Sequence, residues 1–123
     1  MARGLVLLVN SDEDTRTILR DALEHAGYDV LSTPTGAEGL RLAGARRPDV
    51  IIGDFPMDVP GHSPFTEDVR RDGSLGHTRI LSVTGRALDH QIRAAREVSD
   101  SVLVKPVDPK DVVLEVGRLL AAR

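Results

Sequence analysis

The sequence predicts a doubly wound α/β domain, in which helices cover both faces of a five-stranded parallel sheet. Short apolar runs, too brief for helices, alternate with segments whose apolar residues recur every three or four positions. Only three of the 123 residues are aromatic, so the core must be aliphatic, as in parallel strands that are buried on both faces. With right-handed connections, the flavodoxin-like strand order 2-1-3-4-5 is expected for a sheet of this size.

The first strand and helix show this alternation clearly. Leu5 to Val9 is a continuous apolar run and reads as a buried strand. Asp12 can then cap a helix whose apolar residues recur at helical spacing, and Gly27 can close it. The first unit is therefore a strand followed by a helix.

The later segments repeat the alternation, except in one region. We expect strands over 28–32, 50–54, 80–84 and 101–104, and helices over 36–45, 87–98 and 109–121. Residues 55–78 hold three prolines and three glycines, and only Phe65 and Val69 form a helical apolar pair there. This region predicts a long loop and a short, poorly anchored third helix that starts at Ser63-Pro64.

Composition limits the possible classes of function. The net charge is −3, with 16 basic and 19 acidic residues, and no run of one sign suggests nucleic acid or a membrane surface as partner. Cysteine is absent, which excludes disulfides and thiolate metal sites. No apolar stretch has the length of a membrane span. We expect one soluble, cytoplasmic domain over residues 1–123.

Polar residues end or directly follow four of the predicted strands, at the edge where ligands bind in open parallel sheets. They are Asn10, Ser11, Asp12, Asp54, Thr84 and Lys105. A carboxylate there can attack a phosphoryl group, while a hydroxyl and an ammonium bind its oxygens. Mg²⁺, which prefers oxygen ligands, would shield the phosphate from the carboxylate.

With these residues, the chain resembles the response-regulator receiver family over nearly its whole length. Asp54 matches the phospho-acceptor, Thr84 followed by Gly85 matches the hydroxyl position, and Lys105-Pro106 matches a pair whose peptide bond is commonly cis. The resemblance implies phosphorylation of Asp54 by a histidine kinase or phosphotransfer protein, with Mg²⁺ as cofactor. It also implies a downstream protein partner that binds residues 87–120.

Three positions depart from the family's pattern. Asn10 and Ser11 stand where the family has two acids that bind Mg²⁺, the loop 55–61 lacks the usual Pro-Gly placement, and Val102 replaces the aromatic switch residue. We expect weak or absent Mg²⁺ binding, with Asp54, Asp12 and the backbone of Pro56 as the remaining ligands. Opposite charges about 4 Å apart attract by roughly 4 kcal/mol at an effective dielectric near 20, which favours a direct Asp54–Lys105 ion pair.

Several alternatives remain open. Asp12 is either a helix cap or a displaced metal ligand, and Asp58 is either a loop carboxylate or a substitute metal ligand. His62, in the loop after Asp54, is a weak candidate for a site residue. The domain is a receiver with impaired phosphorylation or a pseudo-receiver that only binds proteins. A phosphatase is disfavoured because no Gly-rich phosphate loop follows the first strand. A flavin protein is disfavoured because few aromatic side chains could stack on a flavin ring. We therefore expect that the protein is not an enzyme.

Overall fold

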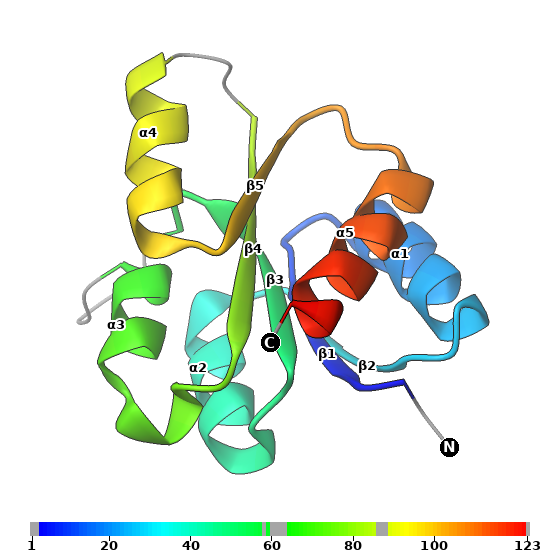
Figure 1. Cartoon of the computed structure of the whole chain (residues 1–123), viewed down its shortest axis with the longest axis horizontal. Coiled ribbons are helices and arrows are strands. Elements are labelled where there is room, and N and C mark those ends of the chain that lie inside the picture. The colour runs from blue at the N-terminus through cyan, green and yellow to red at the C-terminus, as the bar shows by residue number, and fades with distance from the viewer. Residues whose placement is uncertain (1–2, 58, 60–63, 86–88, 123) are drawn as a thin grey trace.

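The computed structural model describes residues 3–57, 59, 64–85 and 89–122 and contains a five-stranded parallel sheet in the order β2-β1-β3-β4-β5 (Figure 1). The strands are β1 (Leu5–Val9), β2 (Asp29–Thr33), β3 (Val50–Phe55), β4 (Arg79–Thr84) and β5 (Ser101–Val104). The helices are α1 (Glu13–His25), α2 (Gly36–Arg46), α3 (Phe65–Arg71), the 3-10 turn η1 (Gly73–Leu75), α4 (Asp89–Val98) and α5 (Pro109–Ala121). The predicted fold class and strand order are confirmed.

The helices form two layers, one on each face of the sheet. Figure 1 shows α1 and α5 together on one face and α2, α3 and α4 on the other. Successive residues of a strand point to opposite faces, so Val6 and Leu8 of β1 join the core beneath α1 and α5. Leu7 and Val9 join the second core, beneath α2 and α3. Both faces of β1 are therefore buried, as its unbroken apolar run predicts.

The chemistry of the helix ends explains several boundaries. Asp12 accepts a hydrogen bond from the backbone N–H of Thr15 at 3.2 Å, which satisfies one of the free donors of the first turn. Gly27 has a φ of 101°, a conformation that glycine adopts without steric cost. Asp108 caps α5, and Pro109 stands at its start. These local signals place α1 and α5 close to their predicted bounds.

The expectation of a poorly anchored third helix was wrong. The helix α3 is short, with seven residues, but Phe65 and Val69 are each only 1% exposed. Arg70 donates to the carbonyl oxygens of Thr78 and Val98 at 3.3 Å each and pairs with Asp100. The helix is held by contacts with residues far away in the sequence, which apolar periodicity does not reveal.

Candidate functional site

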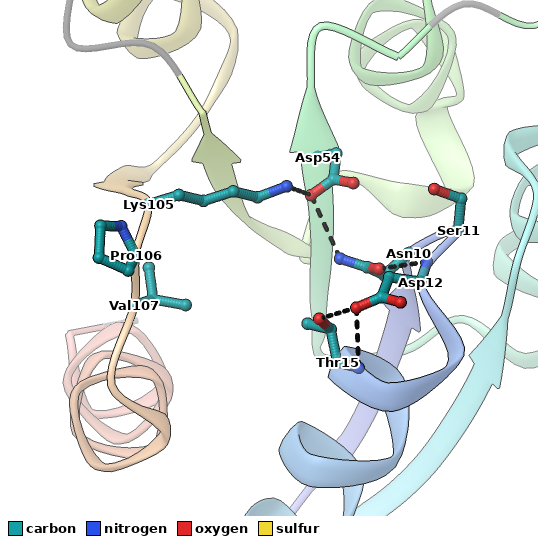
Figure 2. Close-up of a pocket in the computed structure, with 8 residues that line it drawn as sticks. All are labelled: Asn10, Ser11, Asp12, Thr15, Asp54, Lys105, Pro106 and Val107. Carbon is teal, nitrogen blue, oxygen red and sulfur yellow. Dashed lines mark hydrogen bonds and ion pairs between the residues drawn. The ribbon is translucent and has the colours of Figure 1, made fainter.

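The register of the sheet brings the predicted site residues to one edge. Asp54 lies opposite Val83, and Thr84 lies between Phe55 and Val104 in the neighbouring strands. At this edge a cavity of about 520 Å³ is bordered by Asn10, Ser11, Asp12, Thr15, Asp54, Lys105, Pro106 and Val107, which Figure 2 draws. A second hollow of about 540 Å³ shares Ser11 and Asp54 with the first and reaches Pro56.

Asp54 and Lys105 form the ion pair that the sequence predicts. Lys105 Nζ lies 3.1 Å from Asp54 Oδ1, and Figure 2 shows the lysine side chain extended across the cavity toward the carboxylate. The side chains are 25% exposed for Asp54 and 42% for Lys105. Water screens a pair of this exposure, so its net contribution to stability is about 1 kcal/mol or less. Its main effect is on the charge of the pocket.

Asn10 is the second partner of the Asp54 carboxylate. Its Nδ2 donates to Asp54 Oδ1 at 3.3 Å, and its Oδ1 accepts the backbone N–H of Asp12 at 2.8 Å. Its backbone carbonyl accepts from Arg16 at 2.8 Å, and the residue is only 6% exposed. A carboxylate at position 10 would have no hydrogen to donate to Asp54.

These roles of Asn10 and Arg16 were not predicted. From the sequence, we identified Asn10 only as a neutral replacement for an acid, and we assigned no function to Arg16. A signal for Arg16 exists, because it follows the Asp12 cap by one helical turn and can therefore reach back to the strand end. The use of the Asn10 amide depends on the position of Asp54, 44 residues away, and has no local signal.

Asp12 acts as the helix cap, and this interpretation is confirmed. Its carboxylate accepts from the hydroxyl and the backbone N–H of Thr15. These hydrogen bonds, the hydroxyl bond first, lower the pKa of Asp12 below its usual value. Figure 2 shows the carboxylate turned toward Thr15 at the start of α1.

Thr84 and the two prolines occupy different parts of the site. Thr84 is only 1% exposed and is not among the described residues that line either hollow. The Lys105–Pro106 peptide bond is cis, as the resemblance implies, and so is the Phe55–Pro56 bond. The structure thus brings Asp54, Asp12 and Lys105 to one cavity, with Pro56 in the adjoining hollow.

The described residues do not fit a magnesium site. Asp54 is paired with Lys105 and Asn10, Asp12 is engaged by Thr15, and Ser11 offers a neutral hydroxyl. No three acidic or histidine side chains of the described ranges gather around a possible ion. Mg²⁺ is usually held by one or two carboxylates in near-octahedral geometry, and no carboxylate of the described pocket is unengaged. Asp58 and His62 lie outside the described residues.

No helix in the described part of the chain is long and apolar enough to cross a membrane.

Comparisons with known proteins agree on one family. The profile of the response regulator receiver domain matches residues 6–116. The polar-differentiation response regulator DivK of Brucella anthropi is 28% identical over 103 residues, which cover 83% of this chain and 84% of DivK. The chemotaxis response regulator CheY4 of Vibrio cholerae superposes with a TM-score of 0.84 at 31% identity, covering 98% of this chain and 99% of CheY4. A response regulator from Desulfuromonas acetoxidans, at 17% identity, shares the fold with a TM-score of 0.87 over 96% of this chain and 97% of its own. The chain therefore belongs to the response regulator receiver domain family of two-component signalling.

Proposed function

We propose that this receiver domain acts mainly as a protein-interaction module and that Asp54 is at most a poor acceptor of phosphate. The observation that carries the proposal is the engagement of one Asp54 oxygen by both Lys105 and Asn10. The Asp54 carboxylate is thus neutralised by the chain itself. A divalent cation has little negative charge left to bind.

The charge of the phosphoryl group also disfavours phosphorylation of Asp54. A phosphorylated Asp54 carries about −1.5 to −2 charges at neutral pH in place of the single charge of its carboxylate, and these must be balanced near Asp54. Lys105, which pairs with the Asp54 carboxylate before phosphorylation, supplies one positive charge and can balance only part of the charge of the phosphoryl group. Without a bound cation the phosphorylated state is left with uncompensated negative charge in a partly buried pocket, and its formation is disfavoured.

Val102 of β5, at the position of the family's aromatic switch residue, supports the same proposal. Val102 is half-buried and pairs with Ser82 across the sheet. Its short branched side chain has no large ring to move between buried and exposed positions. An interaction module needs no such movement, whereas the relay implied by the family resemblance does.

A second candidate function is phosphorylation of Asp54 with weakly bound Mg²⁺. The retained Asp54 and Lys105 favour it, as does the exposure of the carboxylate to two hollows. In either case the proposed partners are a histidine kinase or phosphotransfer protein and a downstream protein that binds residues 87–120. The expected cytoplasmic location and the absence of nucleic-acid and membrane partners stay predictions, as does the absence of enzymatic activity.

A small-molecule phosphodonor with Mg²⁺ tests the proposal, with intact-protein mass spectrometry as the measurement. We expect no appreciable phosphoryl adduct on the natural chain under conditions that phosphorylate a receiver domain with both acids. Asp54→Asn serves as the control for modification elsewhere. A stoichiometric adduct on the natural chain that Asp54→Asn abolishes would establish the second candidate instead.

A further inference from the structure

A small polar hollow lies between α1 and the edge strand β2, apart from the cavity that contains Lys105. It has a volume of about 180 Å³ and is lined by Glu13, Arg16, Thr17, Arg20 and Ser32. Each of these side chains ends in a charged group or a hydroxyl, so a ligand of this hollow must be polar.

The geometry of α1 and β2 explains why these side chains meet. Arg16 and Arg20 are four residues apart and therefore lie on one side of the helix. Ser32 lies opposite Leu8 in the sheet, and Leu8 belongs to the core beneath α1. Because paired residues of neighbouring strands point to the same face, the serine hydroxyl also points to the α1 side.

Both guanidinium groups are held by neutral oxygen atoms. Arg16 is half-buried, and its Nη1 donates to the backbone carbonyl of Asn10 at 2.8 Å. Arg20 Nη1 lies 3.5 Å from the hydroxyl oxygen of Ser32. A guanidinium has five N–H donors, so most of them stay available to a ligand. Arg16 forms no ion pair in the part of the chain that the structure describes.

Two carboxylates oppose an anion at this place. Glu13 lines the hollow, and Glu24 pairs with Arg20 at 3.5 Å, with both side chains about half exposed. An exposed pair within one helix contributes little, so a ligand can replace Glu24 at a small cost. The two arginines outweigh Glu13, which is the one acid among the described lining residues.

We propose that this hollow binds a phosphate dianion, either free or as the monoester of a small molecule. Guanidinium groups bind phosphate oxygens in a planar fork, and the hydroxyls of Thr17 and Ser32 add donors from other directions. The volume equals that of about six waters at about 30 Å³ each, and it is below the roughly 300 Å³ of pockets that enclose larger molecules. The hollow therefore fits the phosphate group itself and leaves any attached group in solvent.

A bound anion connects to the Asp54 pocket through Arg16. The same guanidinium holds the carbonyl of Asn10, and the Asn10 amide donates to Asp54. The backbone amide signals of Asn10 and Ser11 should therefore shift together with those of the hollow. The inference goes beyond the proposed function, because it requires neither phosphorylation of Asp54 nor a protein partner.

Titration of the full chain with inorganic phosphate, at constant ionic strength and without Mg²⁺, tests the inference by amide NMR. We expect saturable shifts in the hollow with a dissociation constant in the millimolar range, because both guanidinium groups remain partly solvated. Acetate should give much smaller shifts, since a carboxylate accepts from fewer directions. Glycerol 2-phosphate distinguishes the two sources: binding as tight as that of phosphate assigns the site to monoesters, and weaker binding assigns it to the free ion.

Substitutions of opposite effect locate the site. Arg20→Gln should raise the dissociation constant of phosphate at least roughly fivefold, because a charged donor is lost. Glu13→Gln should lower it roughly twofold, because an opposing charge is removed, and this gain does not depend on how the other variant folds. Arg93→Gln, which removes the same charge from an exposed position of α4, should bind phosphate like the natural chain.

Three results overturn the inference. The first is the absence of saturable shifts in the natural chain, and the second is shifts of the same size with acetate. The third is phosphate binding that Arg20→Gln leaves unchanged and Lys105→Gln abolishes, which would place the anion in the Asp54 pocket.

Discussion

Replacing Asn10 and Ser11 by aspartate should create a Mg²⁺ dependence that the natural chain lacks. In the structure the amide of Asn10 donates to Asp54 across 3.3 Å. In the variant two carboxylates face each other at a similar separation, with a third at position 11. Lys105 then neutralises one of three negative charges, so the pocket without metal repels itself and the pocket with metal is balanced.

The magnitude follows from this distance. Two like charges 3.3 Å apart repel by about 1 kcal/mol in bulk water and about 5 kcal/mol at an effective dielectric of 20. Since the Asp54 side chain is a quarter exposed, we expect a destabilisation of about 1–2 kcal/mol without metal, near the screened limit. At a free Mg²⁺ concentration of about 100 times the dissociation constant, binding restores about 2.7 kcal/mol. This corresponds to a rise in Tm of about 10 °C for a domain of this size.

Thermal unfolding with and without millimolar Mg²⁺ measures both effects. The natural chain should unfold at the same temperature in both conditions, and the double variant should unfold at a lower temperature only without metal. Thr17→Asp with Ala94→Asp adds the same two charges at exposed positions away from the pocket and should show no Mg²⁺ dependence. Equal Tm values for the Asn10→Asp, Ser11→Asp variant in both conditions would refute the reasoning that these two side chains prevent cation binding.

Three further predictions concern the scaffold. Gly39→Ala should destabilise the fold by about 1–3 kcal/mol, because a Cβ there lies 2.9 Å from a β1 valine methyl and 3.0 Å from the α3 phenylalanine ring. Gly44→Ala in the same helix is the control: its Cβ meets nothing within 4 Å, and it should stabilise the fold by about 0.5–1 kcal/mol in urea unfolding. Equal effects of the two substitutions would contradict this packing. Burial raises the pKa of Asp100, but the hydrogen bond from the backbone N–H of β4 and the charge of the Arg70 guanidinium outweigh burial, so the pKa in the folded state is lowered. The stability that Asp100 contributes is therefore present above its unfolded pKa of about 3.9. It is lost as the pH falls through the lower pKa of the folded state. Asp100→Asn should therefore cost about 2 kcal/mol at neutral pH and flatten the acid limb of the stability profile, and an unchanged limb would contradict the assignment. Tyr28→Phe should be neutral or slightly stabilising in the same assay, because the buried Tyr28 hydroxyl has no hydrogen-bond partner in the described structure, and a loss above about 1 kcal/mol would reveal one.

Local signals explain why the sequence predicts the order of the elements so well. The apolar run of β1, the Asp12 cap and the left-handed Gly27 each act within a few residues, and each is present in the structure where expected. The Asp54–Lys105 pair was also predictable, since both residues stand at the ends of parallel strands whose carboxyl ends meet at one edge.

The unpredicted features depend on contacts between distant segments. Arg70 and Asp100 are 30 residues apart and join α3 to the connection between α4 and β5, so their pairing leaves no periodic pattern. The second hydrogen bond of the Asn10 amide likewise requires the position of β3. Helix caps and strand patterns depend on interactions between residues close in the sequence. The contacts of Arg70, Asp100 and Asn10 form only when distant segments come together in the folded chain.

The central claim is that the chain itself neutralises Asp54 and leaves no place for a divalent cation. Titration of the natural chain with Mg²⁺, with and without beryllofluoride as a phosphoryl mimic, tests it most directly when amide NMR signals are followed around Asp54, Thr84 and Lys105. The account predicts no saturable shifts at millimolar Mg²⁺ and none that grow with beryllofluoride. Saturable shifts at these residues, enlarged by beryllofluoride, would show a working phosphorylation pocket and contradict the account.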